Sequence, residues 1–521
     1  MDEKPSISPV QPERRPSHQS TSSSPTLREV PRANDIEKNT GPKLLSTGQL
    51  SSADESGEID WSGPDDPKLP INWPQSRKWR NVMIVSTLTF LTPFASSMLA
   101  PAIDQVVEEM KTSNRDVGSF GVSIYLLGYA FGPLMLGPCS ELYGRLIVYH
   151  VCTLLFLILN VACALAVNMP MLIIFRFLTG LVGACPLTIG PGTVSDCFRQ
   201  EGRGRAMADW TTPVLLGPCL GPAIGAYVSR ALGWRWNFWL LIIMLQLCRY
   251  NLPRLSSLSA RDTPPPTLLK QKAKALRKST GDATIRAASQ ATMSRGQLFS
   301  TSITRPIKML FRSPVIFGLS LLTAVAYGTL YLLFTTVTDV FSTRYGIVTN
   351  VGLVYVGFGC GQFVGLFVLG LISDRIVKKA AKGGEMKPEY RLPPMIPGGA
   401  MIPIGLLIYG WTAQYKVFWF VPIIGTFLIG IGMITVFTPV GTYLIDAFPT
   451  YAASATAANT VFRSIGGALL PLAGPRMYDR LGLGWGNTLL AGMSLFMMGM
   501  IVMSLKYGEQ LRTHPRYQLK L

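Results

Sequence analysis

The chain has 521 residues, of which 48% are hydrophobic and only 15% are charged, and its formal net charge is +19. This composition excludes an ordinary soluble globular protein, and apolar runs of about 20 residues, each long enough to cross a bilayer, recur along the chain. In a membrane protein, cationic cytosolic loops explain the excess positive charge. We therefore expect the lipid bilayer, and not nucleic acid, as the partner of the basic residues.

The residues that enzymes most often use are scarce or scattered. His18, His150 and His514 are the three histidines, and none has a neighbouring catalytic constellation. The eight cysteines lie in or beside apolar runs without metal-ligand spacing, which is typical of small packing residues. No ATP-binding loop of the form G-x(4)-G-K-S/T occurs in the sequence. We therefore expect no enzymatic activity, no metal site and no cofactor.

The amino-terminal part of the chain is polar. Residues 1–75 are rich in Ser, Pro, Thr and charged side chains and have little apolar surface to bury, so we expect a disordered cytosolic tail. The first ten residues, MDEKPSISPV, contain no apolar core, so no signal peptide is expected. Trp73 and Trp79 accompany a cluster of cations, and this combination predicts an interfacial anchor before the first membrane segment.

The apolar runs form two groups of six. Because helices satisfy their own backbone hydrogen bonds in lipid, runs of this length predict helices. The expected membrane segments are 82–103, 117–138, 147–167, 171–193, 207–228, 237–247, 315–337, 351–372, 394–411, 417–440, 452–474 and 485–504. We therefore expect an all-α membrane protein with a six-helix bundle at 76–247, a basic cytosolic loop at 248–313, a second six-helix bundle at 314–505 and a cytosolic tail at 506–521.

The cations of the short loops predict the orientation. They concentrate at Arg145, at 199–205 and at 375–391, whereas the opposite side holds only scattered ones such as Lys111 and Lys416. By the positive-inside rule, both termini are cytosolic. Within the central loop, the stretch TLLKQKAKALRKSTG has helical spacing with one basic face, which predicts a surface helix on the acidic leaflet.

The sixth segment, 237–247, is atypical. A polar stretch with Arg249, Pro253 and Arg254 follows it, so only about a dozen apolar residues stand where about 20 are needed. Each arginine would cost about 2.5–3.5 kcal/mol at mid-bilayer, and the proline removes a helix donor. We interpret 248–261 as a misread exon junction or as compensating frameshifts in the gene model. The alternative is a native half-helix that breaks at Pro253.

The run GPCSELYGR, Gly137–Arg145, joins the second segment to the third and is too short for anything but a tight turn. Glu141 and Arg145 are four residues apart, the spacing at which opposite charges meet on one helix face. Gly137 and Gly144 allow backbones to approach closely. Short turns of glycine and charge also join helices in many other folds.

Two features of the first half recur in the second. Glu141 recurs as Asp374, followed by Arg375, 233 residues later. Asp196 recurs as Asp446, 250 residues later, and in each case a small residue and a phenylalanine follow. Both pairs fall at the cytosolic ends of matching segments. This internal repeat predicts two parallel halves related by an axis along the membrane normal.

The turn and the repeat resemble those of the major facilitator superfamily. GPCSELYGR is similar to the family's signature loop between its second and third helices, G-x-x-x-D/E-x-x-G-R/K. The resemblance implies the family's fold of two six-helix bundles. Further segments resemble fungal exporters of drugs and polyamines that have twelve membrane segments, and they cover the chain from about Asp65 to Arg512. These segments are DDPKLPINWP, GWRWNFW, KPEYRLPPM, LIYGWTA, YLIDAF, AASATAANTVFRS and LGLGWGN.

The fifth segment contains GPCLGPAIG, which resembles the motif of drug:proton antiporters in this superfamily, G-x(3)-G-P-x(2)-G-G, with Ala226 in place of the last glycine. Its prolines free backbone carbonyls, and its glycines permit close packing against another helix. The resemblance favours export over uptake. The motif residues are Gly217, Pro218, Gly221, Pro222 and Gly225.

Two arginines lie within membrane segments. A lone Arg176 in the fourth segment is costly unless it faces a cavity or a partner, although it could also reach the outer interface. RFLTGLVGA resembles the family motif whose arginine is linked to proton transfer. We expect Arg176 and Arg463 to supply charge to proton coupling or to a central cavity. Candidates for lining that cavity, each of which could equally be a packing residue, are Tyr125, Tyr129, Tyr327, Tyr331, Gln362 and Asn459.

The acids at the cytosolic ends predict a conformational latch. The eleventh segment begins near Ser454, and its positive helix end could be held by Glu141 in one state and released in the other. We expect Asp196 and Asp446 to belong to the same charge network. The full set expected to form the latch is Gly137, Glu141, Gly144, Arg145, Asp374, Arg375, Asp196 and Asp446.

The resemblance implies a monomeric, proton-driven exporter of small amphipathic compounds such as drugs, polyamines or a fungal secondary metabolite, which works by alternating access. The plasma membrane is the expected location, and a vacuolar membrane is equally compatible with the residues. The alternative is a proton-coupled symporter that takes up a nutrient or vitamin. A membrane sensor would need a large folded cytosolic domain, and the polar tails and central loop are too poor in apolar residues to form one.

Overall fold

The apolar runs fold into helices throughout the part of the chain that the computed structural model describes. The main chain is described for residues 58–59, 66, 69–112, 115–198, 200–259, 286–287, 295–347, 351–381, 387–448 and 451–513. Only the main chain is described at 58–59, 115–116, 200–205, 208, 215, 249–259, 286–287, 295, 298, 351, 373–381 and 513. Most of the predicted tail 1–75 and all of the stretch TLLKQKAKALRKSTG lie outside the described residues.

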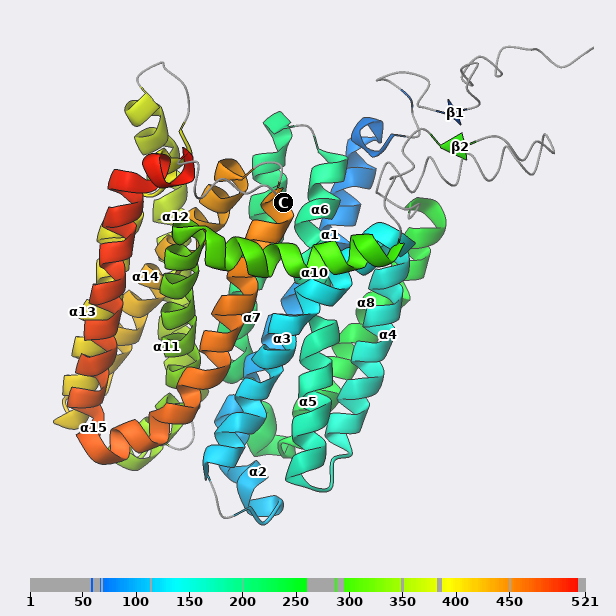
Figure 1. The fold of residues 1–521 in the computed structure, drawn as a ribbon. Helices are drawn as coiled ribbons and strands as arrows, with labels where there is room; N and C mark the ends of the chain where they lie inside the picture. Colours follow the sequence, from blue (N-terminus) through cyan, green and yellow to red (C-terminus); the bar gives the residue numbers. More distant parts are fainter. Residues whose placement is uncertain are drawn as a thin grey trace, which may run out of the picture. The chain divides into compact units, whose positions relative to one another are not determined.

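The first half of the chain supplies one group of helices. Its elements are η1 (Pro70–Asn72), α1 (Gln75–Ser97), η2 (Ala100–Ala102), α2 (Ile103–Glu109), α3 (Arg115–Tyr143), α4 (Arg145–Ala164), α5 (Met169–Gly183), α6 (Cys185–Cys197), α7 (Gln200–Leu232) and α8 (Arg235–Ser259). Helices α5 and α6 follow each other directly and form one membrane segment, Met169–Cys197. Figure 1 shows this group in blue to green.

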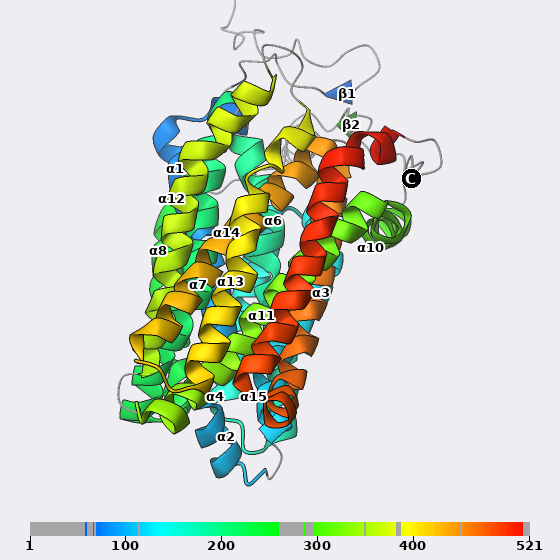
Figure 2. The same ribbon diagram turned by 90° about the vertical axis from the view of Figure 1, so that its left-hand side faces the viewer.

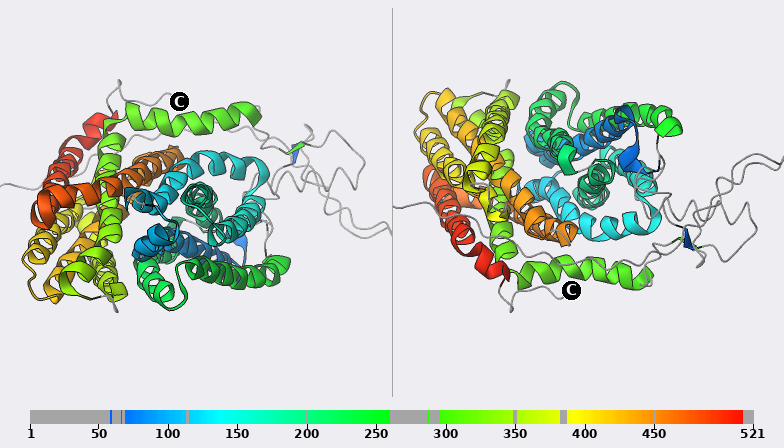
Figure 3. Two further views of the ribbon diagram at one scale, coloured as in Figure 1. Left: turned by 90° about the horizontal axis from the view of Figure 1, so that it is seen from below. Right: turned by 90° about the horizontal axis from the view of Figure 1, so that it is seen from above.

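The second half supplies the other group. Its elements are α10 (Arg295–Arg312), α11 (Pro314–Tyr345), η3 (Val351–Leu353), α12 (Val354–Ala381), η4 (Pro388–Arg391), α13 (Met395–Gln414), α14 (Phe420–Ala447) and α15 (Ala452–Thr513). Figure 2 shows α11 to α15 side by side, and Figure 3 shows the two groups along the helix axes. A two-residue parallel pair, β1 (Glu58–Ile59) with β2 (Arg286–Ala287), completes the described secondary structure.

The described residues contain the twelve predicted membrane segments. Ten helical stretches are long and apolar enough to cross a membrane, and Arg235–Cys248 is apolar but shorter. One of the ten, Ala452–Arg512, holds two segments, because α15 turns at Gly482, whose φ is 74° (Figure 1). Ten stretches, one of them double, plus the short one make two sets of six. The expected all-α fold of two six-helix bundles is confirmed.

Several helices extend past the apolar runs that predict them. The main chain of α8 stays helical through Pro253 to Ser259, so the alternative of a half-helix that breaks at Pro253 is wrong. Helix α15 continues to Thr513, beyond the predicted end of the second bundle at 505. These extensions have a simple reason, because helical backbone hydrogen bonds do not require apolar side chains once a segment leaves the hydrocarbon.

The charges of the loops predict which end of the helices faces the cytosol. We call the end at which α1 begins the inner end and the opposite end the outer end. Large apolar side chains cover the surfaces that would meet lipid, including Ile158 of α4, Phe367 of α12 and Phe496 of α15. Their exposure is what a bilayer requires of a membrane-spanning bundle, and it would be unfavourable in water.

The segment before α1, predicted to be an interfacial anchor, packs against its own bundle. Trp73 is buried, and the guanidinium of Arg77 lies 3.7 Å from the centre of its ring. Lys78 is also buried and donates a 2.6 Å hydrogen bond to the carbonyl of Ile71. Trp79 packs edge-on against Phe198, at the end of α6, with ring centres 5.4 Å apart. The aromatic residues that suggest a headgroup anchor therefore fasten the chain to its own bundle.

The central loop contains a helix that the sequence analysis places elsewhere. Helix α10 lies across the membrane helices in Figure 1 and passes both groups in Figure 3. It buries Met309 and Leu310 against the bundles, while Phe311 and Ile307 remain exposed. This helix is the described surface element of the loop, whereas the stretch predicted to form one lies outside the described residues.

Candidate functional site

Four tyrosines from the two halves converge between the bundles. Tyr125 and Tyr129 lie one turn apart on α3, with ring centres separated by 5.2 Å. Tyr327 and Tyr331 have the same spacing on α11, with ring centres 5.0 Å apart. The hydroxyls of Tyr331 and of Ser96 on α1 share a hydrogen bond of 2.5 Å. The structure thus brings together four tyrosines that the sequence indicated only as separate candidates for lining a cavity.

Arg176 lies within the first bundle and is almost completely buried, so it does not reach the outer interface. Its guanidinium donates to the carbonyls of Ala95 at 2.9 Å and Ser96 at 3.0 Å, both on α1. Two longer hydrogen bonds, of 3.3 and 3.4 Å, reach the carbonyls of Gly121 and Val122 on α3.

The guanidinium of Arg176 also lies 4.9 Å from the centre of the Tyr125 ring, and Tyr125 donates a 2.9 Å hydrogen bond to the carbonyl of Thr92. The arginine therefore joins α5 to α1 and α3 immediately beside the Ser96–Tyr331 contact. Arg176 donates four hydrogen bonds to described residues, and all four acceptors are main-chain carbonyls. A cation inside an apolar run can be recognised in the sequence, but its main-chain hydrogen-bond partners cannot.

Arg463 has very different surroundings. Its guanidinium lies 4.9 Å from the centre of the Tyr327 ring and 5.8 Å from that of Phe437 on α14. Its Nε is buried and has no hydrogen-bond partner among the described residues. One turn further along α15, Gly467 lies against the first bundle: a Cβ there would stand 2.8 Å from Leu126 of α3 and 2.7 Å from Tyr327. Arg463 therefore faces the junction between the halves.

The two predicted amides occupy different places. Gln362 of α12 accepts a 3.0 Å hydrogen bond from the thiol of Cys219 on α7, which links the second bundle to the first. Asn459 of α15 accepts a 2.7 Å hydrogen bond from Thr323 of α11 and lies within the second bundle. Cys219 is a site residue that the sequence analysis reads only as packing. Its position inside the GPCLGPAIG motif is the signal that points to it.

The GPCLGPAIG motif packs α7 closely against α1, as its glycines predict. A Cβ on Gly217 would stand 2.9 Å from the carbonyl of Phe90, and Gly221 and Gly225 approach α1 more closely still. Pro222 has no N–H, so it cannot donate to the carbonyl of Pro218 one turn earlier. The hydroxyl of Ser97 on α1 donates to that carbonyl at 3.2 Å. The prolines and glycines therefore fix the α1–α7 contact.

Several contacts between the halves lie at the tyrosine cluster or on its outer side. Ser96 lies at the outer end of α1, and the Cys219–Gln362 contact lies between α7 and α12. Closer to the outer surface, a Cβ on Gly352 would stand 2.7 Å from the carbonyl of Ala223. In this structure the two halves are closed against each other at the outer end.

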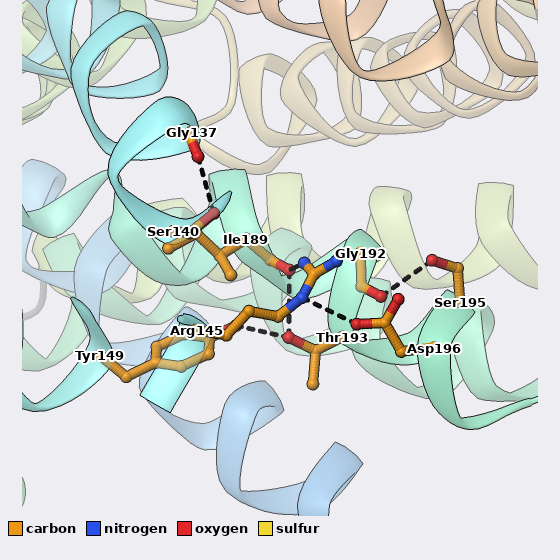
Figure 4. Close-up of polar contacts among 9 residues, drawn as sticks. All are labelled: Gly137, Ser140, Arg145, Tyr149, Ile189, Gly192, Thr193, Ser195 and Asp196. Atoms are coloured by element: carbon orange, nitrogen blue, oxygen red, sulfur yellow. Dashed lines mark hydrogen bonds and ion pairs between the residues drawn. The ribbon is translucent and has the colours of Figure 1, made fainter. Parts of the chain in front are cut away.

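The inner end of the first bundle carries a partly buried charge pair (Figure 4). Arg145, the first residue of α4, places its Nε 2.8 Å from a carboxylate oxygen of Asp196 on α6. It also donates a 3.0 Å hydrogen bond to the carbonyl of Ile189. Gly192 makes this approach possible, because any Cβ at that position would collide with the guanidinium. Tyr149 and Thr193 share a 3.1 Å hydrogen bond beside the pair.

The second bundle has a corresponding pair with a different arginine. Asp446, near the end of α14, lies 2.5 Å from the Nε of Arg391, which ends η4 just before α13. The repeat predicted from Asp196 and Asp446 is therefore real in three dimensions, since each pairs with an arginine that precedes or begins a matching helix. The side chains of Asp374 and Arg375, the pair suggested by the sequence, lie outside the described ones.

The expected pair between Glu141 and Arg145 does not form. Gly144 has a φ of 93°, which ends α3 and reverses the chain, so the two residues do not share a continuous helix face. Glu141 is exposed, and its carboxylate interacts electrostatically with Arg145 and with Arg305 of α10. Arg305 in turn lies 5.7 Å from the ring of Tyr451, next to the start of α15. A latch between Glu141 and α15 stays a prediction.

Comparisons with known proteins agree with this architecture. Residues 85–471 match the model of the Major Facilitator Superfamily. The chain is 50% identical over 482 residues to the MFS-type transporter penM of Penicillium rubens, covering 92% of this chain and 94% of that protein. It is 48% identical over 467 residues to the efflux pump radE of Floropilus chiversii, covering 89% and 86%.

Solved structures give the fold alone. The xylose transporter XylE from E. coli, in a partially occluded inward-open conformation, superposes with a TM-score of 0.61 over 83% of this chain and 98% of that one. The two sequences are 15% identical, so the likeness concerns the arrangement of the helices.

Proposed function

Because this chain belongs to the major facilitator superfamily, and is therefore a membrane transporter, we propose that it exports small amphipathic compounds in exchange for protons. The observation that carries this proposal is the packing of GPCLGPAIG, whose glycines and freed carbonyl at Pro218 fasten α7 to α1. The name of the relative radE, an efflux pump, supports the same direction of transport. Drugs, polyamines and fungal secondary metabolites are the proposed substrate classes.

The contacts between the halves support a rocking mechanism. Opening toward the outside requires the Ser96–Tyr331 and Cys219–Gln362 contacts to separate, because both join α1 or α7 to helices of the other half. The Arg145–Asp196 and Arg391–Asp446 pairs lie within single halves, so each half can move as one body. Substrate would bind beside the tyrosine cluster, where the two halves meet.

The proposed proton coupling assigns an indirect role to Arg176. Arginine stays charged at any physiological pH, so it cannot carry the transported proton. Its buried positive charge would instead influence the protonation of other groups near the tyrosine cluster and hold α1 and α3 in place. We propose the plasma membrane as the location and a monomer as the working unit.

Efflux from intact yeast cells tests the function. Cells that lack their own drug pumps are loaded with amphipathic fluorescent dyes, and the initial rate of dye loss is compared with and without this protein. The proposal expects faster loss that a protonophore abolishes. Energy-dependent accumulation of the probes inside the cells would contradict it and would indicate uptake. Arg480→Gln provides a matched control, since Arg480 is an exposed cation on the outer part of α15.

A further inference from the structure

Arg463 and Arg176 are both arginines within membrane segments, but only one of them has its hydrogen bonds satisfied. Arg176 donates to four main-chain carbonyls. Arg463 has ring faces beside it and no hydrogen bond or ion pair to any described residue. An arginine without partners in a membrane segment is costly, and in such segments it marks a binding site unless a partner is found.

The depth of Arg463 makes this cost significant. It lies eleven residues after the start of α15 at Ala452, which corresponds to about 16 Å along a helix and about half of the hydrocarbon thickness. The described acid nearest in sequence to Phe437 on α14 is Asp446, nine residues away, or about 14 Å along the helix, and it pairs with Arg391. None of the ion pairs among the described residues includes Arg463.

A second unsatisfied group lies at the same level on the other half. Leu126 of α3 meets Gly467 of α15, and the two helices run in opposite directions. One turn toward the inner end from this contact brings α3 to Tyr129 and α15 to Arg463. The Tyr129 hydroxyl is buried and makes no hydrogen bond of good geometry to a described residue, and the side chains of Thr92 and Tyr125 lie within interaction range of it. It also lies within electrostatic range of Tyr327, the residue whose ring Arg463 covers.

The chemistry of these groups selects a ligand. A guanidinium offers several N–H donors and a fixed positive charge, and a phenol offers one O–H donor, so together they match the oxygens of an anion. The rings of Tyr327 and Phe437 offer apolar faces beside the charge. Both halves contribute, which is what a site that alternates between two sides of the membrane requires.

We propose that Arg463 and Tyr129 form an anion subsite, and that the preferred substrates are small aromatic or apolar acids carrying a carboxylate or an acidic phenol. This inference rests on the proposed export function and specifies its substrate class. The substrate's anionic group pairs with the Arg463 guanidinium and accepts a hydrogen bond from Tyr129, while its apolar part lies against Tyr327 and Phe437. Cations such as polyamines are disfavoured at this site.

Three dansyl probes of similar size test the subsite. Dansylglycine is an acid, dansylglycinamide is its neutral amide and dansylcadaverine is an amine, and dansyl fluorescence rises on entry into an apolar site. With the purified full-length protein in lipid nanodiscs, we expect the acid to bind about tenfold more tightly than the amide, as a charge-assisted pair provides. Equal affinities for acid and amide, or tighter binding of the amine, would overturn the proposal.

Variants test whether Arg463 and Tyr129 cause the tighter binding of the acid. Arg463→Gln is expected to remove the difference between acid and amide without weakening amide binding, and Tyr129→Phe to reduce it about threefold. Arg480→Gln, on the same helix, is the matched control and should leave all affinities unchanged. If Arg463→Gln does not fold, Arg463→Lys still decides the question, because the charge alone should keep part of the preference. A folded Lys variant without any preference would contradict the subsite.

Efflux of the same probes separates the two proposals. Export of the neutral amide by cells carrying the protein, without any preference for acids in binding, would leave the export function standing and refute the subsite. Selective binding of the acid without export of any probe from energised cells would refute the export function and leave the subsite standing.

Discussion

Ser96 of α1 and Tyr331 of α11 share a buried hydrogen bond that joins the two halves of the protein, with their hydroxyl oxygens 2.5 Å apart. The main chain at Ser96 also accepts a hydrogen bond from Arg176, so the contact is supported by three helices. Because it lies toward the outer end of α1, it must break before the halves can open outward. The position of this bond leads to the first prediction.

Tyr331→Phe should shift the protein toward the outward-open state. Losing one hydrogen bond of this kind costs the closed state about 0.5–1.5 kcal/mol, which is about a two- to tenfold change in the ratio of states. Accessibility of an engineered cysteine near Gly352 to a membrane-impermeant reagent measures the change. Tyr355→Phe is the control, since Tyr355 donates to the carbonyl of Phe334 within one half. Equal accessibility in both variants would contradict the prediction.

Arg176→Ala should abolish export and also lower stability. Four hydrogen bonds from a buried charged group to main-chain carbonyls would be lost, and about 3 kcal/mol or more of stability with them. Arg176→Lys keeps the charge without the planar fork of donors. Thermal unfolding in detergent and efflux rates are measured together. A stable alanine variant that still pumps would show that the residue serves neither purpose.

Gly192→Ala should displace Arg145 from Asp196. The added Cβ collides with the guanidinium, and overpacking of this kind costs about 1–3 kcal/mol. Gly441→Ala on α14 is the matched control, because a Cβ there meets nothing within 4 Å and alanine favours a helix. Relative to the unsubstituted protein, Gly192→Ala should therefore lower the melting temperature and the turnover rate, whereas Gly441→Ala should raise them. If the two variants lost melting temperature and turnover to the same extent, the steric explanation would be excluded.

Glu141→Gln should slow turnover more than it weakens substrate binding, because the proposed latch biases a conformational equilibrium. The structure adds Arg305 of α10 as its electrostatic partner. Arg305→Gln should reproduce the effect, and the double variant should be less impaired than the sum of the two predicts. Cysteine accessibility at the inner end reports the conformations. Weaker binding with an unchanged distribution of states would refute the latch.

The part of α8 that follows Cys248 is expected to read as apolar in the native transcript. Helix α8 keeps a helical main chain to Ser259, the length that a full membrane segment requires, yet only Arg235–Cys248 is apolar. Sequencing of the transcript across codons 240–265 checks this. If the transcript encodes the printed residues, we expect poor insertion of this segment, and glycosylation mapping of the flanking loops together with pulse-chase degradation would reveal it.

Local pattern was enough to determine most of the architecture. Apolar runs define the membrane segments because each must cover a bilayer thickness independently of its neighbours. The glycines and prolines from Gly217 to Gly225 predict close packing of α7, since the absence of a side chain or of an N–H is a property of the residue itself. The repeat of Asp196 as Asp446 likewise identifies two matching halves. Each of these features can be read from a short stretch of residues or from the repetition of such a stretch.

The tertiary structure decided which charged residues pair with each other. Glu141 and Arg145 have the spacing of a helical pair, but Gly144 reverses the chain between them, and Arg145 pairs with Asp196, 51 residues away. Asp446 takes Arg391 as its partner. Polar groups within a membrane segment bind whatever donor or acceptor the packing brings close, including main-chain carbonyls that carry no residue-specific signal. The sequence by itself therefore determined which charges lie within or beside membrane segments, and only the packing of the helices decided which of them are buried and which are satisfied.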